Sequence, residues 1–291
     1  MKTLLTFTGG IETTYIAWKL LSETEDEVTG IYLHLPVREN VRIFDGDINH
    51  FNKVQPLIKE LNKIRPFNVY RKTCSLSEIT EELNHYYTFF INFAAPYLNI
   101  GVYDRIATGR TWEQAGQKIL TDPNLNGSPS AIAGQRLFDK IVTRGALWNP
   151  LVTHDYHHNF TKAHALLELP ENILSKTFSC IAPFADSEGD LHACGSCYKC
   201  LWIKTIKQKL SEGMTPEQID AWRIEKSYEY GGGDIMAPLR YWLYLELDFP
   251  LPPHINQPVF SNKQELINFV QTTPHYSLKN YNNVGIWGGL T

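Results

Sequence analysis

Short apolar runs alternate with helix-like patterns through the first part of this chain. After the runs, apolar residues recur every three or four positions from Ile11, from Val54 and from about Ser77, which predicts helices. Strands that alternate with helices indicate a parallel sheet with helices on both faces. We therefore expect an α/β fold, with strands predicted over 4–7, 28–33, 68–71 and 105–109.

The second half of the chain is mostly helical in pattern. Thr215-Pro216-Glu217-Gln218 has the form of a capping box with proline at the first helical position, so a helix is expected to start there. Further helices are predicted after Thr161, from Pro170, over 197–210 and over 261–270, and Gly231–Gly233 is the best hinge candidate. We predict three parts: a nucleotide-binding domain over 1–150, a helical portion over 151–230 and a C-terminal extension over 231–291.

Composition and charge narrow the class of protein. The 291 residues are 43% hydrophobic and carry a net charge of −4, which argues against a nucleic-acid binder driven by electrostatics. The apolar run near Met1 is too short for a signal peptide, and no stretch approaches the length of a membrane-spanning helix. We expect a cytoplasmic protein without a membrane partner, and a homodimer stays open.

Four of the five cysteines lie between residues 180 and 200. Two C-x-x-C steps share Cys197, and four converging thiolates suit a divalent metal. A closed Zn²⁺ site of structural type is the leading interpretation, because four thiolates leave no open position for water. An iron–sulfur cluster is the rival, and buried cysteines or a disulfide are a weaker alternative. The predicted ligands are Cys180, Cys194, Cys197 and Cys200, with His192 as a poorer substitute for one of them.

A glycine pair lies between the first predicted strand and the first predicted helix. Glycine lets the backbone approach an anion closely, and the N–H groups of a first helical turn point toward it. The hydroxyls of Thr8, Thr13 and Thr14 add donors around Gly9-Gly10. The lysine of a Walker A sequence and the G-x-G-x-x-G pattern are both missing. The turn is thus a candidate phosphate site, although a tight strand-to-helix turn also uses glycine for steric reasons alone.

These residues resemble a known superfamily. The segment 7–14 resembles the S-G-G-x-D-S motif of the PP-loop ATP pyrophosphatases, which cleave ATP to AMP and pyrophosphate. Within that superfamily, Thr177-Phe178-Ser179-Cys180 and the block 194–200 are similar to the zinc-binding cysteines of 7-cyano-7-deazaguanine synthase. The segments 107–109, 149–151 and 161–164 also look like family segments. The resemblance covers roughly residues 2 to 210.

The resemblance implies a fold, cofactors and roles. It implies ATP and Mg²⁺ at a PP-loop domain, a helical four-cysteine Zn²⁺ portion, and AMP-forming activation of a deazaguanine carboxylate followed by C–N bond formation. The nucleotide would be held by Phe7, Thr8, Gly9, Gly10, Ile11, Glu12, Thr13, Thr14 and Gly109. Lys162 and Glu12 are the predicted catalytic residues, and Arg110 and Arg136 are the candidates for the substrate.

The chain also departs from that family. Glu12 replaces the aspartate of the motif, Thr8 replaces its first serine, and the segment that handles the deazaguanine is reduced to Gly134-Gln135-Arg136. Three alternatives therefore stay open. One is a relative from an anti-phage defence system that joins a deazaguanine to a protein amine. Another is an iron–sulfur tRNA thiolase, and the last is a zinc-stabilised module that binds a nucleotide without turnover.

Overall fold

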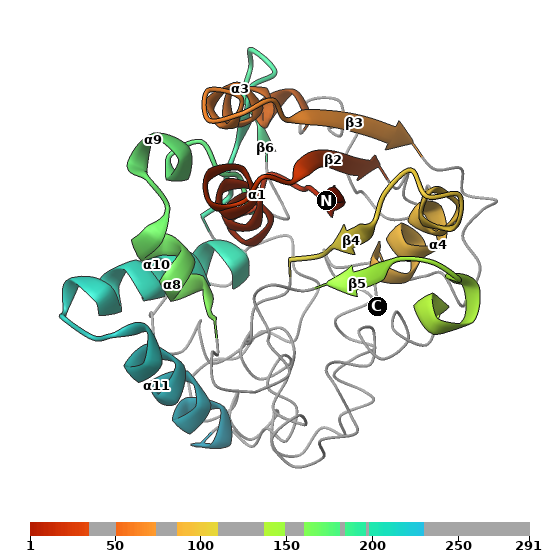
Figure 1. Cartoon of the computed structure of the whole chain (residues 1–291). Helices are drawn as coiled ribbons and strands as arrows, with labels where there is room; N and C mark the ends of the chain where they lie inside the picture. The colour runs from red at the N-terminus through yellow and green to blue at the C-terminus, as the bar shows by residue number, and fades with distance from the viewer. Residues whose placement is uncertain are drawn as a thin grey trace, which may run out of the picture.

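The computed structural model describes residues 1–34, 51–73, 86–109, 137–148, 160–180, 184–195 and 198–229. Its centre is a five-stranded sheet with the strand order β3-β2-β1-β4-β5 (Figure 1). All four strand pairs of this sheet are parallel. The strands are β1 (Lys2–Thr6), β2 (Glu27–His34), β3 (Asn68–Thr73), β4 (Arg105–Ala107) and β5 (Ala146–Trp148).

The strand order reverses at the centre of the sheet. From β1 the chain moves outward to β2 and β3, and then returns to add β4 and β5 on the other side of β1. In open α/β sheets of this kind, ligands bind beyond the carboxyl ends of the strands where the order reverses. The point between β1 and β4 is therefore the first place to look for a site.

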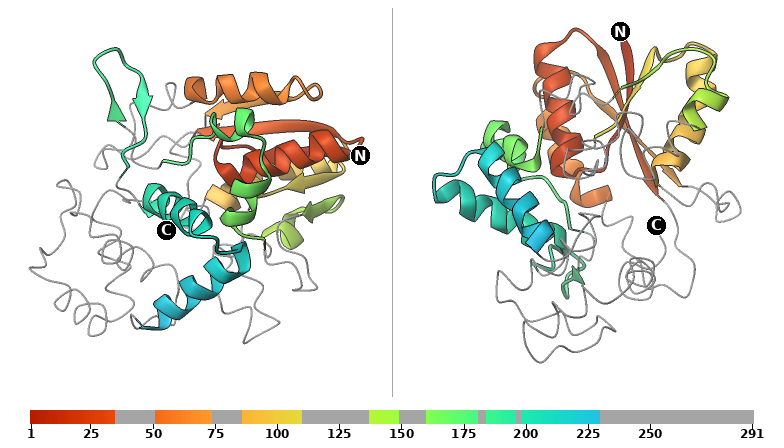
Figure 2. Two further views of the ribbon diagram at one scale, coloured as in Figure 1. Left: turned by 90° about the vertical axis from the view of Figure 1, so that its left-hand side faces the viewer. Right: turned by 90° about the horizontal axis from the view of Figure 1, so that it is seen from below.

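Helices cover both faces of the sheet, so the predicted α/β class is confirmed. Helices α1 (Ile11–Glu23) and α3 (Gln55–Leu61) lie on one face and α4 (Tyr86–Asn99) lies on the other (Figures 1 and 2). Neighbouring residues of β1 point to opposite faces, as the period of a strand requires. Leu5 belongs to the apolar cluster around α1, whereas Leu4 belongs to the cluster around α4.

The predicted helices of the second half are present in the described segments. They are α8 (Lys162–Glu168), α9 (Glu171–Leu174), α10 (Tyr198–Ser211) and α11 (Pro216–Glu229). The capping box is confirmed: Thr215 N–H donates to Gln218 Oε1 at 2.8 Å, and Gln218 N–H donates to Thr215 Oγ1 at 3.3 Å. This half lies beside α1 (Figure 2) and shares one apolar cluster with it, to which Ala163, Leu201 and Ile219 belong.

Three strands were not predicted from the sequence. They are β5 and the two strands of a short antiparallel hairpin, β6 (Phe184–Ala185) and β7 (Leu191–His192). Each has only two or three residues, which is too few for a period-2 pattern to be recognised. The predicted hinge Gly231–Gly233, the helix over 261–270 and the whole extension 231–291 lie outside the described residues.

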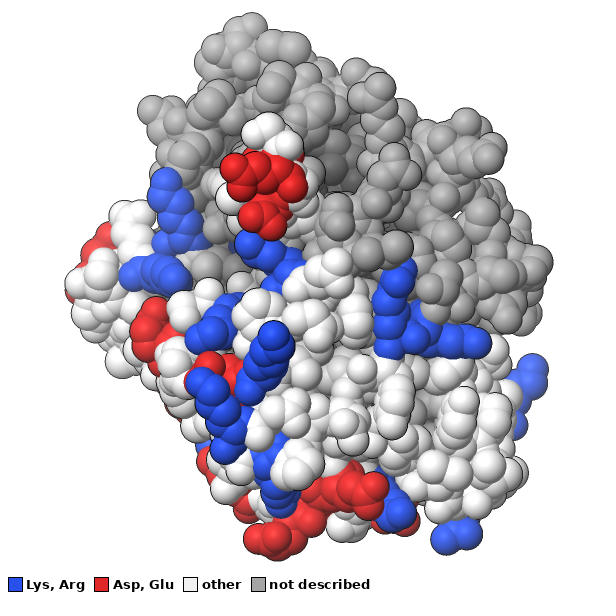
Figure 3. Space-filling model, turned by 90° about the horizontal axis from the view of Figure 1, so that it is seen from above, with Lys and Arg blue, Asp and Glu red and all other residues white. Residues whose placement is uncertain are grey.

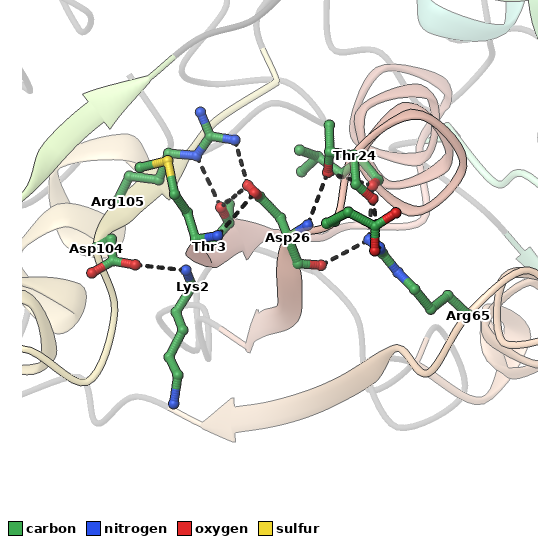
Figure 4. Close-up of polar contacts among 10 residues, drawn as sticks. Lys2, Thr3, Thr24, Asp26, Arg65, Asp104 and Arg105 are labelled. Carbon is green, nitrogen blue, oxygen red and sulfur yellow. Dashed lines mark hydrogen bonds and ion pairs between the residues drawn. The ribbon is translucent and has the colours of Figure 1, made fainter.

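A polar network ties the amino ends of the strands together (Figure 4). Asp26 Oδ2 accepts hydrogen bonds from Thr3 Oγ1 at 2.9 Å and from Arg105 Nη2 at 2.6 Å. Arg105 Nε also donates to Thr3 Oγ1 at 2.9 Å. Arg65 donates to the carbonyl oxygens of Leu20, Thr24 and Asp26. The network thus joins β1, β4 and the turn between α1 and β2.

The described surface carries both signs of charge. On the face that Figure 3 shows, Lys and Arg side chains are interspersed with Asp and Glu, so this face does not present a field of one sign. Among the described residues, no helix is long and apolar enough to cross a membrane.

Candidate nucleotide and metal site

The glycine turn between β1 and α1 is held in a conformation that only glycine adopts easily. Gly9 has a φ of +73°, and a Cβ atom there would lie 2.2 Å from Val54 Cγ1. Gly10 is the N-cap of α1, and its carbonyl accepts the first helical hydrogen bond from Thr14 N–H at 3.0 Å. The backbone of the turn can therefore pack directly against Val54, at the start of α3.

The N–H groups of the turn donate to side-chain hydroxyls. Thr8 N–H donates to Thr13 Oγ1 at 3.2 Å, and Gly10 N–H donates to Thr8 Oγ1 at 3.3 Å. Ile11 N–H donates to Ser179 Oγ at 3.0 Å. These are the donors that an anion at a helix start would use. A phosphate at this turn must therefore replace neutral hydroxyl acceptors.

A buried ion pair lies next to the turn, and Glu12 Oε2 would be 3.6 Å from a Cβ atom on Gly10. Lys162 Nζ is 2.5 Å from Glu12 Oε1, and the two side chains are only 4% and 9% exposed. Glu12 is in the first turn of α1, where the helix dipole favours an acidic group, and Lys162 is the first residue of α8. Sequence reasoning left open whether Lys162 is a solvated lysine on a helix face, and its burial excludes that position.

The charge state of Glu12 follows from its surroundings. Burial alone raises the pKa of this carboxyl, but the ammonium groups of Lys162 and Lys199 and the hydrogen bond from Lys162 lower it below its ordinary value. Glu12 is thus held as a carboxylate at neutral pH. Lys199 lies on α10 within the second C-x-x-C step, so one of the charges that lower the pKa of Glu12 comes from the cysteine segment.

The end of β4 lies close to the same turn. A Cβ atom on Gly109 would lie 3.0 Å from Thr13 Cγ2 and 3.2 Å from Thr13 N, so the segment after β4 packs closely against the first turn of α1. Among the described residues, the buried hydroxyls of Thr6, Thr14 and Thr108 have no hydrogen-bond partner. Thr6 ends β1, and Thr108 directly follows β4. The unpaired hydroxyls therefore belong to the segments that flank the reversal of strand order.

Three of the four predicted metal ligands come together. The sulfur atoms of Cys180, Cys194 and Cys200 all lie within 4.8 Å of one another. Cys180 and Cys194 are 3.5 Å apart at sulfur, and Cys194 N–H points at Cys180 Sγ at 3.3 Å. Tetrahedral zinc with Zn–S distances of about 2.3 Å needs sulfur atoms about 3.8 Å apart, so this arrangement fits a thiolate-bound metal.

The segment between Thr177 and Cys180 touches the glycine turn. Phe178 N–H donates to the Gly9 carbonyl at 2.8 Å, next to the contact between Ser179 Oγ and Ile11 N–H. Sequence reasoning treated Ser179 only as part of a family pattern, and it missed Lys199. Both residues directly precede a cysteine, which is the signal that could have pointed to them.

Other predicted site residues are not in the assembled cluster. Arg110, Arg136 and Cys197 lie outside the described residues. Cys74, the fifth cysteine, which is not a predicted ligand, also lies outside them. His192 Nε2 lies 2.6 Å from Asp186 Oδ2, and the thiol cluster forms without it. His164 accepts the Thr161 N–H at Nδ1 and contacts Glu217 through Nε2, so it joins the starts of α8 and α11.

Fold and site together define the class: a doubly wound α/β protein with a glycine turn at its switch point and a thiol cluster beside it. No protein-family model matches the sequence, and no curated protein does either. Among solved structures, the chain is similar to U34-tRNA thiolase NcsA from Methanococcus maripaludis with its [4Fe-4S] cluster. The identity is 13% and the TM-score 0.38, over 92% of this chain and 80% of that one. This likeness is too remote to transfer the role of any residue.

Proposed function

We propose that this chain is an ATP-using enzyme of the PP-loop type that activates a carboxylate as its adenylate and releases pyrophosphate. The observation that supports this most is the buried pair of Glu12 and Lys162 next to a glycine turn at the switch point of the sheet. A buried ion pair brings little stability of its own, because desolvation offsets most of the attraction. Two opposite charges placed there are better explained as groups that bind ATP, with Lys162 meeting the polyphosphate and Glu12 meeting the cation that accompanies it.

The two charges can exchange partners when nucleotide binds. Lys162 can turn its ammonium group from the carboxylate to a phosphate oxygen, and Glu12 can offer its carboxylate to Mg²⁺. Mg²⁺ held by Glu12 would supply positive charge that neutralises the phosphates. The N–H groups of Gly10 and Ile11 would donate to pyrophosphate in place of the hydroxyls they meet now. Positioning and charge neutralisation are the main tasks of a protein in such a reaction.

The proposed substrate is a deazaguanine carboxylate, and the proposed product contains a new C–N bond. Support for this finer assignment comes from the sequence resemblance at 177–180 and 194–200. Arg110 and Arg136 remain the proposed substrate contacts. Ammonia is the proposed nitrogen donor, and a protein amine would make a protein the second substrate.

We further propose that the thiol cluster holds Zn²⁺ with Cys197 as the fourth ligand. Four thiolates would close the coordination sphere, so this metal would stabilise the fold rather than take part in the reaction. Anaerobic purification followed by visible absorbance separates the two metal types. A colourless protein with one zinc per chain is expected, and a brown protein would favour an iron–sulfur cluster.

The direct test is release of pyrophosphate and AMP from ATP. The metal-loaded protein is incubated with ATP, Mg²⁺, ammonia and 7-carboxy-7-deazaguanine, and the products are followed by mass spectrometry. We expect AMP to appear only with the carboxylate present, and Lys162→Met to slow its formation about 100-fold or more, as expected for loss of a positioned charge. Lys176→Met is the matched control, because Lys176 forms a surface ion pair with Glu60. Nucleotide binding without any AMP would contradict catalysis and favour a binding module.

A further inference from the structure

The three residues Phe178–Cys180, called the strap below, connect the glycine turn to the thiol cluster. Phe178 N–H binds the Gly9 carbonyl, Ser179 Oγ accepts from Ile11 N–H, and Cys180 Sγ lies in the cluster. Phe178 and Cys180 are both buried, at 8% and 7% exposure. Consecutive residues of one segment, with Phe178 and Cys180 buried and Ser179 half-buried, thus contact two different candidate binding sites.

We propose that the strap couples metal binding at the cysteines to phosphate binding at the glycine turn, with Ser179 as the positioning residue. This inference rests on the proposed function, since it assumes that the turn receives the phosphates of ATP. The coupling is separate from the chemical step, because neither Ser179 nor Cys180 needs to touch the reacting atoms.

The physical basis is the short distance along the backbone. A metal bound to Cys180 fixes the position of that residue, since thiolate–metal distances vary by only about 0.2 Å. Ser179 is the next residue, so its hydroxyl is then held against the first turn of α1. Without the metal, Cys180 loses this bond and keeps contacts such as those to Cys194, which are weaker than a bond between a thiolate and a metal. The hydroxyl of Ser179 is then less firmly placed at Ile11 N–H.

The space around the turn makes a serine well suited to this position. A Cβ atom on Gly10 would lie 3.3 Å from Ser179 Oγ and 3.3 Å from Thr8 Oγ1, so the turn and the strap are in close contact. A serine hydroxyl can accept one hydrogen bond and donate another. Ser179 can therefore keep the Ile11 N–H oriented before nucleotide binds. Once a phosphate oxygen has replaced its hydroxyl at that N–H, Ser179 can donate a hydrogen bond to the phosphate.

Thermodynamic linkage makes the coupling measurable from both sides. If bound zinc raises nucleotide affinity by some factor, then bound nucleotide must raise zinc affinity by the same factor. A coupling of this kind is typically about 5-fold to 150-fold. Because the effect passes through the strap, replacing Ser179 should remove it while both separate sites remain.

The first experiment needs no nucleotide. Hydrogen exchange is compared for the peptide covering residues 7–14 in the zinc-loaded full chain and in the chain stripped by a chelator. We expect zinc to slow exchange at Ile11, and Ser179→Ala in the zinc-loaded protein to speed it by about 5-fold, the effect of one ordinary hydrogen bond. The peptide covering β2 reports whether the fold has survived stripping. If Ser179→Ala left the rate of hydrogen exchange at Ile11 unchanged in the zinc-loaded protein, the inference would be overturned.

The second experiment measures zinc release to a chelator with and without an ATP analogue that has a methylene bridge between its α and β phosphates. We expect the analogue to slow release at least about 5-fold in the wild type. Ser179→Ala should keep one zinc per chain but lose this protection. Ser175→Ala is the matched control, since its hydroxyl contacts only the nearby Glu171 carbonyl among the described residues.

The two experiments separate the inference from the proposed function. An analogue that binds but leaves zinc release unchanged would overturn the coupling and leave the proposed function standing. A protein that binds no analogue would contradict the proposed function and, with it, the coupling to phosphate. Zinc-dependent protection of Ile11 in that protein would then leave the strap only as a structural link between the metal and the turn.

Discussion

The two ends of the central sheet are built differently. At the amino ends, Asp26, Thr3 and Arg105 form hydrogen bonds with one another at distances of 2.6–2.9 Å (Figure 4). Arg65 donates hydrogen bonds to three carbonyl groups there. At the carboxyl ends, N–H groups meet hydroxyls at 3.0–3.3 Å, and the Thr108 hydroxyl is buried without a partner among the described residues. At the amino ends these polar groups form hydrogen bonds with one another. At the carboxyl ends some polar groups form longer hydrogen bonds, and the Thr108 hydroxyl forms none within the described part of the chain.

This difference separates stability from function within one sheet. A buried hydroxyl without a partner costs about 1–3 kcal/mol, so such groups are rare where a protein gains nothing from them. Departures from good local chemistry tend to cluster at functional sites. The reversal of strand order lies at the same end, which is where α/β proteins bind ligands. These observations support the proposal that the amino end serves stability and the carboxyl end serves binding.

The largest expected effect is at the thiol cluster. Cys180→Ser removes the most buried of the three described ligands, and we expect zinc affinity to fall by more than about 100-fold, since even outer-shell changes cost 10–100-fold. Metal analysis of the purified protein measures this. Cys74→Ser serves as the matched control, because Cys74 is not one of the four predicted ligands. Equal zinc content in the two variants would show that Cys180 does not bind the metal. The metal site could then not be counted among the features of the carboxyl end of the sheet.

The next largest effect is at the buried ion pair. Lys162→Met leaves the Glu12 carboxylate buried without this partner, and we expect a loss of about 3–5 kcal/mol in the free energy of unfolding. The double variant Glu12→Gln with Lys162→Met should regain most of that stability, because no buried charge is then uncompensated. It should not regain nucleotide affinity. Recovery of both would mean that the pair is structural and that the two ends of the sheet do not differ in role.

The fold could largely be predicted from the sequence, because long periodic segments and cap residues are local signals. The glycine turn, the capping box at Thr215 and the convergence of Cys180 with Cys194 all follow from short motifs. The pairing of Glu12 with Lys162 could not be derived from periodicity, since the two residues are 150 positions apart and meet only through packing of α8 on α1. The contact of Ser179 with Ile11 joins residues 168 positions apart and was missed for the same reason.

A smaller effect is expected at the amino end. Asp26→Asn removes the charge that faces Arg105, and we expect a loss of about 1–3 kcal/mol in the free energy of unfolding. Nucleotide affinity should stay within twofold of the wild type when measured by calorimetry. If this variant weakened nucleotide binding as strongly as Lys162→Met does, the separation of the two ends would be wrong.

The smallest effect is the dependence of that loss on pH. Burial raises the pKa of Asp26, but hydrogen bonds from Thr3, the amino group of Met1 and Arg105 lower it below its ordinary value. A carboxyl whose pKa is lowered by folding stabilises the folded state above its unfolded pKa of about 3.9, and this contribution is lost as the pH falls through the folded pKa. The difference in unfolding free energy between wild type and Asp26→Asn should thus be constant above about pH 5 and shrink in more acid solution. A difference that grows on acidification would contradict this assignment.

The apolar cluster that contains both Leu5 and Leu201 has a practical consequence. A fragment ending near residue 150 would carry α1 with its outer side stripped of Ala163, Leu201 and Ile219, while the complementary fragment would expose the same apolar area. The two pieces should then behave like the subunits of an obligate heterodimer, insoluble when expressed separately and recovered together when co-expressed. Expressing the two fragments together would therefore test whether they assemble. The affinity of each site is best measured on the intact polypeptide.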